Sequence, residues 1–440
     1  MSRKTLLVVF GGTGDLMKRK LAPAFAKVIA SGAVSKDSAI IGVSRKNLSH
    51  EDYCLWLVES LNEQEKKDLA SLKILYAQGD ASQPEGLDAL SELLKNYEGY
   101  EKVFYLAVSF NIFSRILSSL EKRELLREAK IVFEKPFGSD LKSSDQLDAE
   151  IHKYFPEDNI YRIDHYLAKE TVLNLTTLKF SNPMIEAILR NEFVETIEVI
   201  ADEDLGVGNR INYYNDSGAI KDMIQSHLLQ VLALLLIDQP SKILPEEIHR
   251  EKVKVLSNIG LAESQEHLLG QYESYPHELS KAGLGSSKTE TFAKLFLNCN
   301  TERWKGVRLI LRTGKKLPKK YGQIKVTFKK ILGYVENKLT IDIFPKQDIV
   351  LTVNARVPGG TSETVKPVRF EFCRDCEFGP NSPDEYAVLL QEIIEGNRLL
   401  FPKYEEIRES WRIVDEIEKM KGKMKFVIYI DRSEPQDNFN

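Results

Sequence analysis

The sequence predicts two parts: an α/β domain with a parallel, doubly wound sheet over residues 1–170, and a larger α+β domain with a mostly antiparallel sheet over residues 171–440. Three observations predict this division. Apolar strands alternate with helices up to about residue 170, which is typical of a parallel sheet. The first strand runs into a glycine turn and a helix. From residue 293 onward, strand-like runs follow one another with few helices between them, which is typical of an antiparallel sheet backed by helices.

The opening of the chain predicts a dinucleotide-binding unit of the Rossmann type. Residues 4–10 form a continuous apolar run that stops at Gly11-Gly12-Thr13-Gly14, and a helix is expected next. Glycines let the backbone approach a pyrophosphate, and the partial positive charge of the helix N-terminus holds it. The third place of the G-x-G-x-x-G pattern has no glycine, so a tight turn without a ligand is the alternative interpretation.

The second strand, residues 39–43, indicates which dinucleotide is bound. It ends in Ser44-Arg45-Lys46. A site specific for NAD carries an acidic residue at this place to bind the ribose hydroxyl, whereas an arginine suits the 2′-phosphate of NADP. Arg45 therefore favours NADP, and an exposed arginine without a ligand is the alternative.

The remaining elements of the first part continue the alternation. Strands are expected at 72–76, 102–108 and 131–133, and helices near 52–61, 85–94 and 112–126. The strand at 131–133 runs into Glu134-Lys135-Pro136-Phe137-Gly138. Lys135 thus lies just beyond a strand end, where open parallel sheets bind their ligands.

The stretch from Arg162 to Glu170 holds a carboxylate, an imidazole, a phenol, an ammonium and a guanidinium group. If the chain is extended up to Tyr166 and helical after it, His165 and Lys169 come within reach of one anion. Together with the Tyr166 hydroxyl they are donors suited to a phosphate. Asp164 would point away from its neighbours, because side chains alternate along a strand. A solvated charged turn is the alternative interpretation.

The second part is expected to combine helices with a sheet. Helices are expected at 173–188, 218–236, 387–400 and 407–420, and strands at 196–200, 293–297, 307–312, 324–328, 339–344 and 349–354. The helix at 218–236 carries Asp222 and His227 in its first turns. Its apolar run from 228 to 237 is interrupted by Gln230 and indicates a core helix rather than a membrane span.

Composition narrows the class of protein. The chain has 440 residues and a net charge of −4, so no bulk basic field argues for nucleic acid. The first apolar run is too short for a signal peptide, and four cysteines indicate a reducing compartment, so a cytoplasmic protein without membrane association is expected. Cys373 and Cys376 form a C-x-x-C without the second pair of a zinc site. Two incidental thiols are favoured over a redox or metal function, and no metal site is predicted.

Five motifs, considered with their order, resemble the glucose-6-phosphate dehydrogenase family. They are Gly11-Gly12-Thr13-Gly14-Asp15-Leu16, Glu134-Lys135-Pro136-Phe137-Gly138, Arg162 to Glu170, Gly218 to His227, and Arg312-Thr313-Gly314-Lys315, and they span most of the chain. The resemblance implies oxidation of C1 of glucose 6-phosphate to 6-phosphogluconolactone with hydride transfer to NADP, the first step of the oxidative pentose phosphate pathway. It also implies a homodimer formed through the second domain.

The resemblance assigns roles to individual residues. His227 matches the base that takes the proton of the C1 hydroxyl, a task suited to a histidine with a pKa near neutrality. Asp164 would accept the second ring N–H of His227 and fix its tautomer. Positions that match contacts to the sugar or its phosphate are Lys135, His165, Tyr166, Lys169, Glu203, Asp222, Lys315 and Lys320. Positions that match cofactor contacts are Gly11, Gly12, Thr13, Gly14, Asp15, Leu16, Lys18, Arg45, Asp80, Ala81 and Lys135.

The geometry of an α-helix limits the assignment of Asp222 to the site. Asp222 lies five residues before His227, which places it about 140° away round an α-helix, so it shares the site only where the chain enters the helix. The other histidines outside the Arg162 to Glu170 stretch have polar neighbours and are expected at the surface; they are His50, His152, His249, His267 and His277.

The chain departs from the family's pattern at four places. Ala168 replaces a usual glycine, Ser109-Phe110 replaces a proline-containing pair, Phe344 stands where a polar residue is common, and Gly208-Asn209 replaces a more acidic loop. These departures bear on substrate affinity and cofactor preference more than on the type of reaction.

Two other functions compete with this interpretation. A sugar oxidoreductase of the glucose–fructose oxidoreductase type explains residues 1–138, including the Glu-Lys-Pro, but not the donors at 165–169. A non-catalytic NADP-binding protein would bind the cofactor without turnover. Activity on free glucose alone would select the first, and cofactor binding without turnover would select the second.

Overall fold

A computed structural model describes residues 4–59, 61–70, 73–263, 265–359, 365–379 and 384–435. The chain forms two compact units, Met1–Ala168 with Pro383–Tyr404, and Lys169–Ser382 with Glu405–Asn440. The sequence predicted one boundary after residue 170, with everything beyond it in the second domain. The structure differs because a late segment returns to the first unit.

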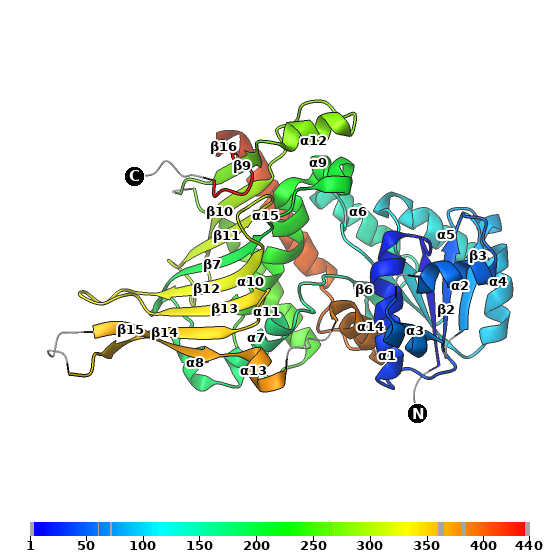
Figure 1. The fold of residues 1–440 in the computed structure, drawn as a ribbon, viewed down its shortest axis with the longest axis horizontal. Helices are drawn as coiled ribbons and strands as arrows, with labels where there is room; N and C mark the ends of the chain where they lie inside the picture. Colours follow the sequence, from blue (N-terminus) through cyan, green and yellow to red (C-terminus); the bar gives the residue numbers. More distant parts are fainter. Residues whose placement is uncertain are drawn as a thin grey trace. The chain divides into compact units, whose positions relative to one another are not determined.

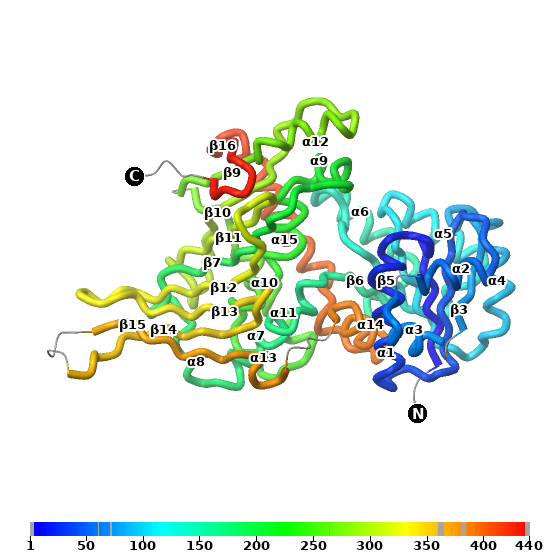
Figure 2. Tube along the Cα trace, in the orientation of Figure 1, coloured from blue at the N-terminus to red at the C-terminus, as the bar shows by residue number. Residues whose placement is uncertain are grey.

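Helix α14 (Glu385–Glu395) is the core of this returning segment. It packs against α1 (Ala22–Ala30), and Figure 1 and Figure 2 both show the two helices side by side. The ammonium group of Lys130 also donates a hydrogen bond to the carbonyl of Ile393 at 2.5 Å. That bond joins residues 263 positions apart. No local pattern in the sequence indicates such a contact.

The first unit is built on a six-stranded parallel sheet in the order β3-β2-β1-β4-β5-β6. Its strands are β1 (Thr5–Phe10), β2 (Ala39–Ser44), β3 (Lys73–Gln78), β4 (Glu101–Leu106), β5 (Ala129–Phe133) and β6 (Ile160–Arg162). Its helices, besides α1 and α14, are α2 (His50–Val58), α3 (Glu63–Leu69), α4 (Asp88–Leu94), α5 (Phe113–Lys122) and α6 (Leu141–Ile151). The predicted α/β fold is confirmed; β6 as a separate short strand, α3 and α6 were not predicted.

Strand β1 lies at the centre of this unit and is buried along its whole length. Its side chains Leu6, Val8 and Phe10 share one core with Leu90 of α4 and Ile116 of α5. A central parallel strand has helices over both faces, and for this reason the opening of the chain reads as a continuous apolar run. The carboxyl ends of neighbouring parallel strands meet at one edge of the sheet, which is where ligands bind in such folds.

The second unit is built on a ten-stranded sheet in the order β15-β14-β13-β12-β7-β11-β10-β9-β16, with β8 paired to β10 (Figure 1). Its strands are β7 (Val194–Asp202), β8 (Ile259–Leu261), β9 (Leu268–Tyr272), β10 (Phe292–Cys299), β11 (Arg308–Gly314), β12 (Tyr321–Phe328), β13 (Lys338–Phe344), β14 (Ile349–Arg356), β15 (Val365–Phe372) and β16 (Lys425–Tyr429). Neighbours are antiparallel except for β7 with β11 and β9 with β16. The predicted mostly antiparallel sheet is confirmed; β8, β9, β15 and β16 were not predicted.

The helices of the second unit include one long apolar stretch, Gly208–Leu236. They are α7 (Glu170–Phe180), α8 (Pro183–Ile188), α9 (Ile211–Ala219), the π-helix η7 (Ile220–Leu228), α10 (Leu229–Leu236), α11 (Pro245–Ser257), α12 (Tyr275–Lys281), α13 (Arg374–Phe378) and α15 (Tyr404–Met420). Among the described residues, the stretch Gly208–Leu236 is the one helical stretch long and apolar enough to cross a membrane, and 83% of its most apolar window is buried inside the protein. Such burial is that of a core helix, as the sequence predicted.

Candidate functional site

The turn after β1 brings the backbone close to its neighbouring strand. Gly11 has a φ of +87°, a conformation that favours glycine, and its N–H donates to the carbonyl of Val43 at 3.0 Å. A Cβ on Gly12 would lie 2.5 Å from the Cα of Gly42 in β2. Packing of the turn therefore requires glycine at both positions, whether or not a ligand is bound.

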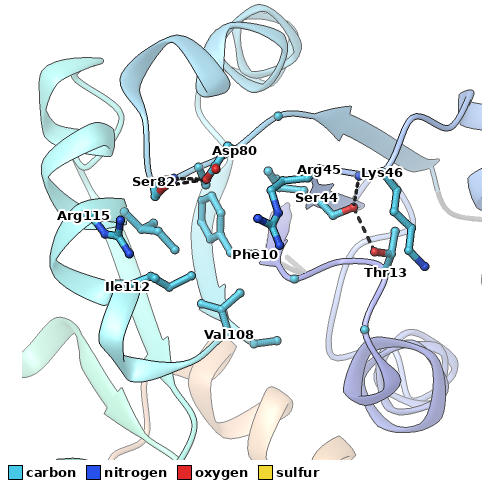
Figure 3. Close-up of a pocket in the computed structure, with 17 residues that line it drawn as sticks. Phe10, Thr13, Ser44, Arg45, Lys46, Asp80, Ser82, Val108, Ile112 and Arg115 are labelled. Atoms are coloured by element: carbon cyan, nitrogen blue, oxygen red, sulfur yellow. Dashed lines mark hydrogen bonds between the residues drawn. The ribbon is translucent and has the colours of Figure 1, made fainter.

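A pocket of about 620 Å³ opens at the carboxyl ends of these strands (Figure 3). It is lined by Phe10, Gly11, Thr13, Gly14, Val43, Ser44, Arg45, Lys46, Gly79, Asp80, Ala81, Ser82, Ala107, Val108, Ile112, Arg115 and Ile116. This lining includes six of the predicted cofactor residues: Gly11, Thr13, Gly14, Arg45, Asp80 and Ala81. Five others, Gly12, Asp15, Leu16, Lys18 and Lys135, are not among the lining residues.

Polar groups gather on the wall of the pocket formed by the end of β2. The hydroxyl of Thr13 donates to Ser44 Oγ at 3.0 Å, and that oxygen lies 2.7 Å from the hydroxyl of Tyr76. Arg45 and Lys46 follow directly and are exposed. Two cations and two hydroxyls at one strand end suit a phosphate. Ser44 and Lys46 were not among the predicted cofactor residues, although the run that contains them ends a strand.

Another polar group of the pocket is the carboxylate of Asp80, which follows β3. Ser82 donates to Asp80 Oδ1 from its hydroxyl at 2.7 Å and from its N–H at 3.0 Å. These hydrogen bonds, with smaller contributions from the charges of Arg45 and Arg115, lower the pKa of Asp80. The carboxylate is therefore held ionised at the mouth of the pocket.

Two predicted cofactor residues have partners on the surface of the first unit. The ammonium of Lys18 pairs with Glu59 at 2.6 Å and lies 5.3 Å from the ring centroid of Trp56. The carboxylate of Asp15 pairs with the guanidinium of Arg19 at 2.8 Å. A role of either side chain toward a cofactor stays a prediction.

Lys135 follows β5 and the buried carboxylate of Glu134. Glu134 Oε1 accepts hydrogen bonds from the hydroxyls of Tyr105 at 2.5 Å and Tyr386 at 3.1 Å. Burial raises the pKa of Glu134, although these hydrogen bonds oppose that effect. The two tyrosines hold this carboxylate in place and thereby stabilise the backbone that carries Lys135.

The stretch that begins at Arg162 is a strand end followed by a turn, so the expectation of an extended chain up to Tyr166 is wrong. Strand β6 ends at Arg162, whose buried guanidinium pairs with Asp148 at 2.6 Å and with Glu157 at 2.8 Å. Asp164 Oδ1 accepts the N–H of Tyr166 at 2.9 Å. This local bond competes with extension of the strand and forms the turn. The ring centroids of His165 and Tyr166 lie 5.1 Å apart, edge to face.

Lys169 opens the second unit, at the N-cap position of α7. Its ammonium lies 5.3 Å from the ring centroid of Phe344, and the ammonium of Lys320 lies 5.9 Å from the same centroid. The aromatic ring thus brings together two lysines that are far apart in the sequence. Phe344, which departs from the family's pattern, therefore lies among the predicted phosphate ligands.

A second group of charged side chains lies in the same unit, with Lys315 and Asp222 buried and Glu203 partly exposed. The ammonium of Lys315 donates to the carboxylate of Glu203 and lies 5.5 Å from the ring centroid of Tyr214. Burial, followed by the negative charges of Asp222 and Glu290, raises the pKa of the Tyr214 hydroxyl well above its usual value. The structure therefore brings together Glu203, Lys315 and, through its field at Tyr214, Asp222.

The π-helix η7 carries both Asp222 and His227, which are 1% and 0% exposed. Hydrogen bonds in a π-helix run between residues five apart, so such residues lie nearly above one another on one face. The expected separation of about 140° was wrong because it assumed an α-helix. With π-helical geometry, Asp222 and His227 share a face.

The entry to η7 explains why Gly218 precedes this helix. Gly218 has a φ of +63°, and a Cβ there would lie 2.2 Å from Oε1 of Glu290. That oxygen accepts the N–H of Ile220 at 3.1 Å, while Lys421 pairs with the other carboxylate oxygen at 2.7 Å. Glu290 thus caps the π-helix and positions Asp222 and His227. Glu290 was not predicted as a functional residue, since it lies 70 residues from its partner Ile220.

Two histidines that were expected at the surface are buried instead. His249 is 2% exposed, and its Nδ1 lies 2.5 Å from Glu406, whose carboxylate also pairs with Lys252. His267 Nδ1 accepts the N–H of Phe296 at 3.2 Å. Both expectations were wrong because a buried partner, distant in the sequence, satisfies each ring.

The interpretation of Cys373 and Cys376 as two incidental thiols is also wrong. The two residues form a disulfide at the start of α13. Cys373 is the N-cap residue of this helix, and its Sγ accepts the N–H of Cys376 at 3.3 Å. A helical turn places residues three apart on one face, which brings these two side chains together.

The predicted site residues divide between the two units. Lys135, Asp164, His165 and Tyr166 belong to the first unit, and Lys169, Glu203, Asp222, His227, Lys315 and Lys320 belong to the second. The pairing of Asp164 with His227 stays a prediction, as does a phosphate site shared by His165, Tyr166 and Lys169.

Comparison with known families finds matches over nearly the whole chain. The family described as "Glucose-6-phosphate dehydrogenase, NAD binding domain" matches residues 8–174, and "Glucose-6-phosphate dehydrogenase, C-terminal domain" matches residues 176–438. A glucose-6-phosphate 1-dehydrogenase of Bacillus subtilis is 35% identical over 447 residues, which cover 94% of this chain and 91% of that protein.

Solved structures give the same picture. The structure described as "Glucose-6-phosphate dehydrogenase in complex with its substrate glucose-6-phosphate" is similar with a TM-score of 0.90 and 28% identity, over 99% of this chain and 96% of that one. A levoglucosan dehydrogenase in complex with NADH has a TM-score of 0.54 and 9% identity over 96% of this chain and 98% of that one, a likeness of fold alone.

Proposed function

The chain belongs to the glucose-6-phosphate dehydrogenase family, and on that premise we propose how its residues perform the family's reaction. It oxidises C1 of D-glucose 6-phosphate to 6-phospho-D-glucono-1,5-lactone and passes a hydride to NADP+. The C1 hydroxyl loses its proton, the C1–H bond breaks with both electrons leaving as hydride, and a C=O bond forms. A base and a hydride acceptor are therefore required.

The pocket of the first unit fits NADP. Its glycine turn lets the backbone approach a ligand at a strand end, and Arg45 and Lys46 offer cations for the 2′-phosphate. When bound, NADP+ supplies the hydride acceptor. Gly11, Thr13 and Gly14 would hold its pyrophosphate, and Asp80 and Ala81 would lie along the same pocket.

His227 is the proposed base. Its ring is buried on η7, where water is excluded, and the fixed π-helix holds it in one place. Asp164 would accept its second ring N–H, so that the nitrogen facing C1 is free of a proton before the reaction and the imidazolium formed is stabilised. This pairing is supported by the burial of Asp164 in the turn that follows β6.

Substrate binding is proposed to divide between two groups of residues. His165, Tyr166, Lys169 and Lys320 would bind the phosphate, since they are cations or hydroxyl donors. Lys135, Glu203, Asp222 and Lys315 would contact the sugar. The Lys315–Glu203 pair and the Lys169–Phe344–Lys320 arrangement support this division, because each holds charged groups in place before any ligand arrives.

The proposal also covers the oligomeric state of the protein and its cellular location. A homodimer formed through the second unit is supported by exposed apolar side chains on both edge strands of its sheet, Phe370 of β15 and Ile428 of β16 among them. A cytoplasmic protein that binds a small sugar phosphate, without nucleic acid or membrane partners, is part of the same proposal. Light scattering at two protein concentrations tests the dimer.

The single observation that carries the catalytic proposal is that η7 places a buried histidine and a buried carboxylate on one helix face. The experiment is to follow absorbance of the reduced nicotinamide with purified protein and NADP+, with glucose 6-phosphate or free glucose as substrate. Formation of NADPH with the phosphate ester alone is the expected result. Activity on free glucose alone, or cofactor binding without turnover, would overturn the proposal in favour of one of the two competing functions.

A further inference from the structure

Arg115 lies on the wall of the cofactor pocket that faces away from Arg45. It stands on the first turn of α5, which follows β4, whereas Arg45 follows β2. Strand β1 separates β2 from β4 in the sheet. Figure 3 shows the two arginines on opposite sides of the pocket, with Phe10 between them in this view.

The charges of both guanidinium groups act on one carboxylate in the pocket. Each contributes to the lowered pKa of Asp80, after the larger contribution of the hydrogen bonds from Ser82. Arg115 is exposed, and within the described part of the chain it forms no hydrogen bond or ion pair. A planar cation is thus held at the pocket without a protein partner.

Several apolar side chains lie beside Arg115 in the lining of the pocket. Val108, Ile112 and Ile116 accompany it together with Ser82, while the cations Arg45 and Lys46 lie on the β2 side. An apolar surface with one planar guanidinium suits a flat aromatic base, because arginine stacks on such a face and needs no specific hydrogen bond to do so. A phosphate would find one cation here, and the hydroxyl of Ser82 on this side already donates to the carboxylate of Asp80.

We infer that Arg115 stacks on the adenine base of the dinucleotide, while Arg45 binds the 2′-phosphate. The inference rests on the proposed NADP site of the first unit. Adenine is common to NAD and NADP, so Arg115 strengthens the binding of both nucleotides equally. Arg45 strengthens the binding of NADP alone.

The test uses two fragments of the cofactor that lack the nicotinamide, 2′,5′-ADP and 5′-AMP, titrated into the purified full-length protein by calorimetry without any sugar. Arg115→Ala is expected to weaken binding of both fragments by about five- to tenfold, in the range seen when a side chain that stacks on a base is removed. Arg115→Lys keeps the charge but not the plane and should recover only part of this loss. Arg45→Ala should weaken 2′,5′-ADP and leave 5′-AMP unchanged.

Lys122→Ala is the matched control, since it removes one positive charge from the same helix outside the pocket. It should leave both affinities unchanged. Unchanged affinities in Arg115→Ala would overturn the inference, and so would a loss confined to 2′,5′-ADP, which would make Arg115 a phosphate ligand. If the wild-type protein bound neither fragment, the proposed cofactor site itself would fall together with this inference, whereas turnover with NADP and an unaffected Arg115→Ala variant would remove the inference alone.

Discussion

The cofactor pocket of the first unit and the charged cluster of the second unit are built in different ways. The pocket is formed by a backbone turn and by strand ends, and its cations Arg45 and Lys46 are exposed. The cluster is formed by ionisable side chains inside the protein: His227, Asp222 and Lys315 are at most 2% exposed.

Because of this difference, a substitution in the pocket should change ligand affinity without changing stability, whereas a substitution in the cluster should change both. Water and salt screen an exposed charge, so its removal changes the affinity for a ligand with little effect on the folded state. A buried charge needs a partner in order to stay folded, and removal of one partner leaves the other uncompensated. Substitutions in the second unit should therefore affect both chemistry and stability, and those in the pocket only ligand preference.

The largest effect is expected for His227→Asn. The variant lacks the proposed base but keeps a polar group of similar size, so kcat should fall by about a thousandfold, within the usual range for loss of a general base. The KM for glucose 6-phosphate should change little, because the phosphate ligands remain. Initial rates of NADPH formation measure both constants. Thermal unfolding checks that the variant is folded, and an unchanged kcat would exclude His227 as the base.

The next largest effect is expected for the stability of a variant in the charged cluster. Lys315→Met should lower the free energy of unfolding by about 2–3 kcal/mol, since it leaves the Glu203 carboxylate without its cation. The loss should stay below that of a fully buried pair, because Glu203 keeps 30% of its side-chain surface exposed. Urea denaturation measures the change. In the same assay, Arg45→Ala should lower the free energy of unfolding by less than about 0.5 kcal/mol. Equal losses in the two variants would contradict the difference in stability between the two regions.

Lys169→Ala tests the phosphate site. Removal of one ammonium near Phe344 should raise the KM for glucose 6-phosphate by about ten- to thirtyfold, or about 1.4–2 kcal/mol, with a smaller effect on kcat. Steady-state kinetics with varied glucose 6-phosphate at saturating NADP+ give these values. Lys319→Ala is the matched control: this lysine lies 4.7 Å from the ring centroid of Tyr321 and is not a predicted ligand. Identical saturation curves for Lys169→Ala and the wild type would remove Lys169 from the phosphate site.

The smallest effect is expected for Arg45→Ala. The ratio of kcat/KM for NADP+ to kcat/KM for NAD+ should fall by about tenfold, which corresponds to about 1.4 kcal/mol, because one exposed ion pair with the 2′-phosphate is lost. Kinetics with each nucleotide at saturating glucose 6-phosphate measure the ratio. A ratio equal to that of the wild type would show that another cation binds the 2′-phosphate. The neighbouring Lys46 would then be the candidate.

The fold of the first unit could be predicted closely because its signals are local. The apolar run before Gly11 marks a central parallel strand, and the position of Arg45 at a strand end follows from the alternation of strands and helices. Both features depend on neighbours within a few residues. The same reasoning identified six of the residues that line the pocket, but not Arg115, which no local pattern distinguishes from an exposed helical arginine.

The residues of the charged cluster in the second unit were selected through the resemblance to the family, and their geometry was not predicted. Asp222, His227 and Lys315 lie in the family's motifs, whereas Glu203 matches a position outside them. Their arrangement depends on Glu290, which lies far along the chain and caps η7 beside Gly218. The periodicity of an apolar helix does not reveal a π-helical turn, so the angle between Asp222 and His227 was assigned wrongly.

By itself, the sequence determined the fold class, the family and the residue types that a dehydrogenase of a sugar phosphate requires, because strands, turns and motifs are written in short stretches of the chain. Only the tertiary structure decided which charges are buried, as with His249 against Glu406, and that α14 returns to the first unit. It also paired Cys373 with Cys376 and set Asp222 on the face of His227. Burial and helix geometry are decided by the packing of the whole chain: the partner that stabilises a buried charge or caps a helix can lie anywhere along the sequence.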